Sequence, residues 1–154
     1  CVCVCVSPPQ VNRFNKSTDR ALLITDQFVY KLEPKKQFKV LKRVPLDLFT
    51  GLSVTSGVDQ MAVLHTSSHD DVLMCLQPGE LCPNQDRVGE LVGVLVDHFS
   101  RVRNGPFHVK VCCSALQLQM RGRPKSVTVE TKPGQTITDF KKSRNGFVLL
   151  LPAN

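Results

Sequence analysis

The sequence contains no tryptophan and only one tyrosine, and it has no long apolar run. A transmembrane helix needs about 18 or more consecutive apolar residues, so none is expected here. The opening CVCVCV has no basic lead-in and is too short for the apolar region of a secretory signal. Most of the eight Phe and the single Tyr fall at core-like strand positions, which leaves few platforms for stacking bases. We therefore expect neither a membrane-spanning segment nor a nucleic-acid partner.

The motifs of common active sites and metal sites are also missing. No G-x-x-x-x-G-K-[ST] sequence is present to cradle nucleotide phosphates. The seven cysteines show neither zinc-site spacing nor a disulfide framework, which favours a reduced, cytoplasmic protein. Ser67 and Ser68 lie near His65 and Asp70, but they read as turn residues without a nucleophile elbow. The prediction is no catalytic residue, no metal, no cofactor and no enzymatic activity in this chain.

Charge is distributed unevenly along the chain, whose net charge is +7. Residues 1–43 contain nine Lys or Arg against three Asp or Glu, and residues 101–154 contain ten against two. Between them, residues 44–100 contain one basic residue and eight acidic ones. This segregation indicates a basic face for a polyanion, either a membrane surface or nucleic acid. An ordinary solvated surface is the alternative.

Alternating apolar residues and turn signals predict a β-rich α+β domain. The expected strands are 11–14, 20–25, 27–33, 38–43, 50–55, 61–66, 72–76, 107–113, 126–131 and 146–151. One amphipathic helix is expected after a cap at 84–86, with a single buried stripe. The stripe consists of Val88, Leu91, Val92, Leu95, Phe99 and Val102. Residues 1–10 are expected to lie outside a domain that spans 11–154, because Ser7-Pro8-Pro9 interrupts the alternation of CVCVCV.

The first predicted strands bring five basic side chains to one edge of the sheet. In an antiparallel meander alternate connections lie at the same end, so the loops at 15–19 and 34–37 share one rim. The basic rim, as we call this set, consists of Arg13, Lys16, Arg20, Lys35 and Lys36. Arginine offers a phosphate a planar fork of donors, and lysine offers a point charge. The basic rim is therefore the candidate anion-binding site, and Lys31, one step inside it, is left out.

Several short motifs follow one another in a specific order. They are RFNK (13–16), RALLIT (20–25), YKLE (30–33), VPLD (44–47), TGLSV (50–54), RVGELVGVL (87–95) and NGF (145–147). Together they resemble the tail homology 1 (TH1) domain of class I myosins, of the short-tailed Id and Ig type, over roughly residues 11–154. The resemblance implies a pleckstrin-homology-like fold, with antiparallel sheets, one amphipathic helix and extra C-terminal strands.

The resemblance also implies binding of anionic membrane phospholipids, especially phosphoinositides such as phosphatidylinositol 4,5-bisphosphate. In the family, a basic residue ends the first strand and a basic-x-Arg tripeptide begins the second. By position, Arg13 corresponds to the first basic residue and Arg20 to the last. The middle basic position falls near Thr18, which is neutral, and Asp19 adjoins it.

These observations lead to one main functional hypothesis and two alternatives. The main hypothesis is a membrane-anchoring tail module that links an actin-based motor to membranes, on the inner face of the plasma membrane or endomembranes and in the actin cortex. Actin and ATP would be bound only by a motor head that this sequence does not contain. Because the sequence begins at Cys1 rather than Met, we expect it to be part of a longer protein. The alternatives are a protein-interaction scaffold of pleckstrin-like fold and, last, a nucleic-acid-binding domain.

Overall fold

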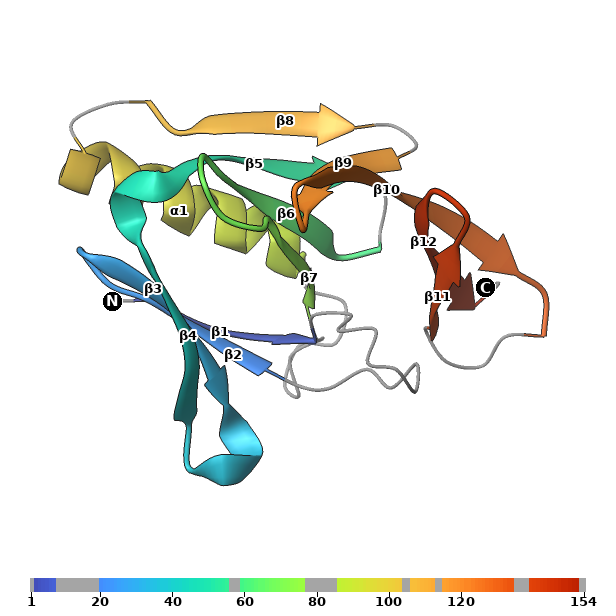
Figure 1. The fold of residues 1–154 in the computed structure, drawn as a ribbon, viewed down its shortest axis with the longest axis horizontal. Helices are drawn as coiled ribbons and strands as arrows, with labels where there is room; N and C mark the ends of the chain where they lie inside the picture. The colour runs from blue at the N-terminus through green and yellow to red at the C-terminus, as the bar shows by residue number, and fades with distance from the viewer. Residues whose placement is uncertain are drawn as a thin grey trace.

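The structure is a computed structural model that describes residues 2–7, 20–55, 59–76, 86–103, 106–112, 115–134 and 139–152, with backbone alone for 2–7 and 152. Within these ranges the chain forms two β-sheets and the helix α1 (Arg87–Arg103) (Figure 1). None of the described helices combines the length and apolar content that crossing a bilayer requires.

The first sheet has eight strands in the order β4-β3-β2-β1-β7-β6-β5-β8. Their bounds are β1 (Val2–Ser7), β2 (Arg20–Ile24), β3 (Phe28–Glu33), β4 (Lys39–Pro45), β5 (Phe49–Thr55), β6 (Met61–Thr66), β7 (Val72–Leu76) and β8 (His108–Cys112). Single 3₁₀ turns connect β3 to β4 (η1, Pro34–Lys36) and β4 to β5 (η2, Leu46–Leu48). Neighbouring strands are antiparallel except β5 and β8, which run parallel. The hairpin of β3 and β4 therefore forms one edge of this sheet.

The second sheet has four strands in the order β11-β12-β10-β9. Their bounds are β9 (Ala115–Met120), β10 (Arg123–Lys132), β11 (Asp139–Ser143) and β12 (Gly146–Pro152). Strands β10 and β12 run parallel, and the other two pairs are antiparallel. In Figure 1 this sheet lies beside β5 and β6, at the far end of the molecule from the β3–β4 hairpin.

Strand β6 shows why the two sheets pack as they do. Its side chains alternate between the two faces, as in any strand. Ala62 and Leu64 join the core between the first sheet and α1, whereas Met61 and Val63 join the core shared with the second sheet. Because both faces are covered, the strand reads as a continuous apolar run rather than as an alternating one.

Helix α1 begins where the sequence predicts. The Asp86 side chain accepts a hydrogen bond from the Gly89 backbone N–H at 2.9 Å, and Gln60 Oε1 accepts one from the Val88 N–H at 3.0 Å. These side chains satisfy N–H groups that have no partner within the helix. The buried stripe ends at Phe99, and Val102, which was expected to continue it, is exposed.

The strand predictions are confirmed for most of the first sheet. Those at 61–66 and 72–76 match β6 and β7 in both bounds. Three strands were not predicted, namely β1, β9 and β11. The predicted strand at 11–14 lies outside the described residues. The two parallel pairings also differ from the antiparallel sheets that were expected.

Residues 1–10 were expected to lie outside the domain, but the structure places β1 inside the first sheet. Val2 pairs with Ile24 and Val6 with Arg20, and the other edge of β1 pairs with β7. The six-residue alternation before the prolines is therefore long enough to fill a position between two strands. Whether a domain boundary falls at residue 11 stays a prediction, since residues 8–19 are not among those described.

Candidate functional site

Three residues of the basic rim lie at the same end of the β2–β3–β4 meander. Arg20 begins β2, and Lys35 and Lys36 form η1 directly after β3. Since Ala21 pairs with Leu32 in the antiparallel ladder, the start of β2 meets the end of β3. Arg13 and Lys16, the other two members, lie outside the described residues.

A glutamate that the sequence interpretation did not weigh lies among these cations. Glu33 ends β3, and its Oε1 is 3.6 Å from Arg20 Nη1 while its Oε2 is 3.6 Å from Lys36 Nζ. The side chains of Arg20 and Glu33 are 13% and 19% exposed, whereas that of Lys36 is 67% exposed. An anion arriving at this end must therefore compete with a carboxylate that is already in place.

The positive charge extends beyond the basic rim along one face of the sheet. Lys31 lies opposite Leu22 on β2 and opposite Lys42 on β4. Alternation along β2 puts Arg20 on the same face as Leu22, which belongs to the core that α1 covers. Arg20, Lys31 and Lys42 thus share the inner face of the sheet. We call these three residues the inner-face cations.

The electrostatics of Lys31 reflect this arrangement. Burial lowers the pKa of the Lys31 ammonium, and the positive charges of Arg20 and Lys42 lower it further. A like-charged pair directly across two strands is unfavourable unless an anion lies nearby. Lys31 therefore belongs with the candidate site, although the sequence interpretation left it out.

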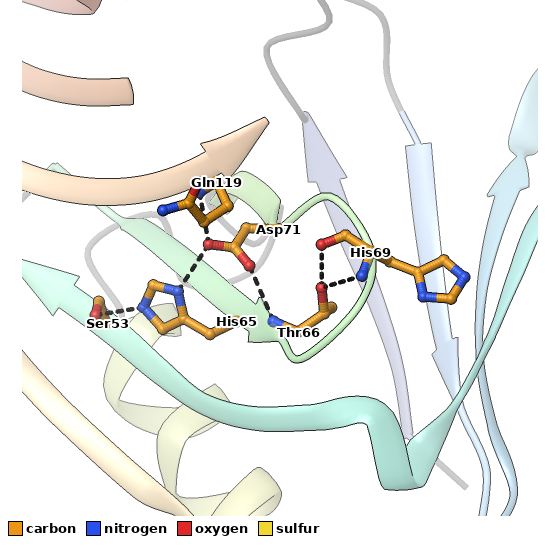
Figure 2. A network of polar contacts seen from close by, with 6 residues as sticks. All are labelled: Ser53, His65, Thr66, His69, Asp71 and Gln119. Carbon is orange, nitrogen blue, oxygen red and sulfur yellow. Dashed lines mark hydrogen bonds and ion pairs between the residues drawn. The ribbon is translucent and has the colours of Figure 1, made fainter. Parts of the chain in front are cut away.

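A second polar cluster lies on the opposite face of the same sheet, toward the second sheet (Figure 2). Ser53 Oγ is 2.6 Å from His65 Nε2, and His65 Nδ1 is 2.9 Å from Asp71 Oδ2. This Ser–His–Asp order is that of a hydrolase triad, though it uses different residues from the serines weighed in the sequence. Ser68, one of those serines, instead contacts the ring of His69 at 3.0 Å.

The surroundings of Ser53 indicate a structural role for this cluster. Ser53 is 4% exposed and sits in the middle of β5, between β6 and β8. A nucleophile needs space for a substrate carbonyl and for oxyanion donors beside it, and a buried mid-strand serine has neither. We therefore interpret the cluster as a hydrogen-bond network that stabilises the fold rather than as an active site.

Asp71 extends this hydrogen-bond network to the second sheet. Its carboxylate accepts backbone hydrogen bonds from Thr66 at 2.9 Å and from Gln119 at 2.8 Å, and the Asp71 N–H donates to the Gln119 carbonyl at 2.9 Å. Burial alone would raise the pKa of Asp71, but the hydrogen bonds from His65, Gln119 and Thr66 outweigh it and leave the pKa below its usual value. Strand β9 is thereby fastened to the β6–β7 turn.

Comparison with known proteins places this architecture in a family. Residues 6–149 match the model of the family described as "Unconventional myosin tail, actin- and lipid-binding". The chain belongs to this myosin TH1 family. The match begins within β1, which agrees with the place of that strand in the sheet.

Individual myosins are also similar to this TH1 chain. It is 45% identical over 145 residues to unconventional myosin-Id of Danio rerio and 46% identical over 145 residues to unconventional myosin-Ig of Mus musculus. It is 44% identical over 149 residues to unconventional myosin-Id of Homo sapiens. Each alignment covers 94% of this chain and 14% of the relative, so the chain corresponds to a small part of those myosins.

A solved structure shares the fold of this TH1 chain. The hSac2 domain from human phosphoinositide phosphatase Sac2 superimposes with a TM-score of 0.56 at 11% sequence identity, over 80% of this chain and 79% of that one. At this identity the likeness concerns the fold alone. The pleckstrin-homology-like α+β fold expected from the sequence is confirmed.

Sequence patterns carried a signal for two residues that the interpretation missed. The alternation in YKLE places Lys31 and Glu33 on one face of β3, and the register against β2 then puts Glu33 beside Arg20. The pairing of Lys31 with Lys42 is harder to foresee. It depends on a register shift between Lys31 and Leu32 in the β3–β4 ladder, which the local sequence pattern does not predict.

Proposed function

We propose that this TH1 chain is a membrane-anchoring module that binds anionic phospholipids through the basic rim and the inner-face cations. The observation that supports this most is the convergence of Arg20, Lys31 and Lys42 on one face beside the lysines of η1. Burial lowers the pKa of the Lys31 ammonium first, and the positive charges of Arg20 and Lys42 lower it further. A phosphate seated among these side chains would relieve that repulsion.

Phosphoinositides are the headgroups that best suit this arrangement. Each basic residue close to an anionic leaflet contributes about 1 kcal/mol, and the contribution fades within a Debye length. Glu33 offsets part of this attraction, because it already pairs with Arg20 and Lys36. A headgroup with several phosphates competes with one carboxylate more effectively than a single phosphodiester does. We therefore propose a preference for phosphorylated inositol lipids over phosphatidylserine.

In the full-length protein, the module would hold an actin-based, ATP-driven motor at a membrane. This step rests on the relatives, of which the chain covers 14%. The expected location is the cytoplasmic face of the plasma membrane or endomembranes, in the actin cortex. The chain itself is expected to have no enzymatic activity, and the motor head would supply ATP hydrolysis.

Vesicle co-sedimentation tests the proposal. The chain is mixed with vesicles of phosphatidylcholine alone, with added phosphatidylserine, or with added phosphatidylinositol 4,5-bisphosphate, at low and high salt. Binding is expected only to the anionic vesicles, most strongly to those with phosphoinositide, and to weaken as salt rises. The double variant Arg13→Gln/Arg20→Gln should bind about 30-fold more weakly, since two charges are each worth about 1 kcal/mol and every 1.4 kcal/mol is tenfold.

A matched variant separates the site from net charge. Lys110→Gln/Lys132→Gln removes two exposed charges from β8 and the end of β10, away from the β2–β4 edge. This control should bind as the wild type does. Equal loss in the two double variants would show that the charge of the whole chain, rather than the proposed site, attracts the membrane.

A protein partner is the second candidate function. The family description names actin as well as lipid, and a hollow of about 290 Å³ lies between the start of α1 and β8. Val88, Val92, Val109 and Val111 line it together with Asp86 and Gln60. Co-sedimentation of the chain with filamentous actin tests this candidate directly. Actin binding that survives Arg13→Gln/Arg20→Gln would assign the partner to a surface other than the basic rim.

A further inference from the structure

The tip of the β3–β4 hairpin exposes apolar side chains that the fold does not use. Phe38, Val40 and Leu41 are 54%, 53% and 43% exposed. The other exposed large apolar residues in the described ranges, Val102 and Val111, lie singly on α1 and β8. Single exposed apolar residues are ordinary, whereas three within four positions form a patch that calls for an explanation.

The hairpin is placed so that it can reach a surface. Strand β4 is the edge strand, and its first five residues are exposed before Val44 enters the core. Figure 1 shows the end of the hairpin projecting away from α1 and from the second sheet. Its apolar side chains thus have no neighbouring element to cover them among the described residues.

At the tip, the exposed Phe38 has a backbone conformation that is energetically unfavourable for a residue with a side chain. Gln37 and Phe38 have φ angles of 53° and 56°, in the left-handed region that disfavours residues with a Cβ atom. Glycine or asparagine would form such a turn more easily. A bulky aromatic residue in this position is not explained by folding, and it therefore suggests a function at the tip.

The charges around the patch indicate what covers it. Residues 35–43, KKQFKVLKR, contain five basic residues and no acidic one. The basic residues are Lys35, Lys36, Lys39, Lys42 and Arg43. Apolar side chains surrounded by lysine and arginine match the interface of an anionic bilayer, where the apolar groups enter the acyl boundary and the cations remain among the headgroups. Charge repulsion disfavours a second copy of the same hairpin, and lysines and a register shift on an edge strand oppose pairing with another strand.

We propose that the tip of the β3–β4 hairpin, residues 35–43, inserts Phe38, Val40 and Leu41 into the interfacial layer of an anionic membrane. The inference rests on the proposed function, because it takes the same bilayer as partner and adds an apolar contact to the electrostatic one. Since Lys35 and Lys36 belong to both the tip and the basic rim, and Arg20 lies at the same end of the meander, these described residues bring both contacts to one end of the molecule. The domain therefore meets the membrane with the β3–β4 end first.

The absence of tryptophan gives a direct test by fluorescence. In Phe38→Trp, the emission should shift to the blue when vesicles of phosphatidylcholine and phosphatidylserine are added, and lipids brominated near the headgroup end of the acyl chains should quench it. Val111→Trp places the same reporter at a position on β8 that is 62% exposed, against 54% for Phe38. Its emission should stay unchanged.

A binding measurement completes the test. Phe38→Asn/Leu41→Gln removes apolar area but keeps every charge, and asparagine suits the left-handed turn. Partitioning onto phosphatidylserine vesicles should fall about tenfold or more, given the area that two such side chains bury. The salt dependence should remain, and Val111→Thr should partition as the wild type does.

The outcomes distinguish this inference from the proposed function. If the wild type binds anionic vesicles but the Phe38→Trp variant shows neither shift nor quenching, or Phe38→Asn/Leu41→Gln binds normally, insertion is wrong and the electrostatic site stands. If the wild type ignores anionic vesicles at low salt, both proposals fail. A blue shift of the Phe38→Trp emission that grows with protein concentration in the absence of vesicles would assign the tip to self-association, and it would overturn insertion.

Discussion

At the scale of single residues, Lys31 lowers the stability of the fold at the position where we propose that phospholipid binds. Its ammonium is partly buried, and Lys42 lies directly opposite it on the neighbouring strand. The lowered pKa means that the folded state holds this proton less tightly than the unfolded state does. Since the unfolded chain binds more protons between the lowered pKa and the ordinary value of 10.5, stability rises with pH through that interval. At neutral pH the full penalty is present.

Lys31→Met should therefore stabilise the isolated chain while it weakens membrane binding. Removing a like-charged cross-strand contact is expected to raise the free energy of unfolding by about 0.5 kcal/mol at neutral pH, and the methionine keeps the apolar stem. Urea denaturation measures the gain. Binding to phosphoinositide vesicles should fall several-fold, since one charge near a leaflet is worth about 1 kcal/mol.

Lys110→Met on β8 is the control, because it lies opposite Ser53 rather than another cation. It should leave vesicle binding unchanged, and its free energy of unfolding should change by less than that of Lys31→Met. A loss of stability in Lys31→Met would mean that the Lys31 ammonium is already neutralised in the free protein.

At the scale of elements, local alternation was sufficient to predict most of the first sheet and α1. Met61–Thr66 and Val72–Leu76 are bounded by clear turn signals, so their ends were predicted to the residue. The sequence does not predict strand β1, because the prolines that follow it indicate an interruption, yet Val2–Ser7 is long enough to form a strand before them. Parallel pairing was missed for a different reason. It joins segments far apart in sequence, and no local pattern records which strands will meet.

The candidate site could be predicted only in part, for the same physical reason. Meander geometry is local, and it brought Arg20 and the η1 lysines to one end of the sheet. The pairing of Glu33 with Arg20 and the register shift that aligns Lys31 with Lys42 depend on interstrand contacts. The exposure of Phe38 depends on how far the hairpin projects beyond the core, which composition does not reveal.

Each of the two parallel pairings has a glycine at which the two backbones approach closely, and this close approach can be tested by substitution. Gly146 begins β12 opposite Ser126, and a Cβ atom added there would lie 1.9 Å from the Ser126 carbonyl oxygen. A Cβ on Gly51 would lie 2.6 Å from the His108 carbonyl oxygen, at the start of the β5–β8 pairing. Both glycines permit a close approach of two backbones. Gly146→Ala should thus lower the free energy of unfolding by about 3 kcal/mol, measured by urea denaturation.

Gly93→Ala is the matched control for Gly146→Ala. Gly93 is exposed in the middle of α1, and an added Cβ there would meet nothing within 4 Å. Alanine favours a helix interior over glycine, so this change should raise the free energy of unfolding by about 0.5–1 kcal/mol. If Gly146→Ala were as stable as the wild type, the close parallel pairing of β10 and β12 would be wrong.

At the scale of the whole molecule, the two sheets are joined by a shared apolar core and by hydrogen bonds to the neighbouring carboxylates of Asp70 and Asp71. The first sheet carries Arg20, the lysines of η1 and the hairpin tip, whereas the second packs against β5 and β6 at the other end (Figure 1). Met61, Val63 and Leu73 of the first sheet contribute the apolar contacts of this core. The directional part comes from Asp71, which contacts β6 and β9 at once (Figure 2). Removing the Asp71 carboxylate should therefore loosen the second sheet without affecting the end that we propose binds the membrane.

Asp71→Ala should lower the free energy of unfolding by about 3 kcal/mol at neutral pH, because the hydrogen-bonding groups of His65, Thr66 and Gln119 lose a charged acceptor. The pKa of Asp71 lies below its ordinary value of 3.8, so its contribution is fully present above that pH and is lost as the pH falls through the lowered pKa. Urea denaturation from pH 7 downward should accordingly show the free energies of unfolding of the wild type and Asp71→Ala converging in acid.

Asp70→Ala is the neighbouring control, since Asp70 accepts one backbone hydrogen bond from Arg121. This change should lower the free energy of unfolding by about 1 kcal/mol. Vesicle binding should be retained in both variants at neutral pH. If the difference in free energy of unfolding between the wild type and Asp71→Ala stays constant in acid, the ionised carboxylate is not what joins the two sheets.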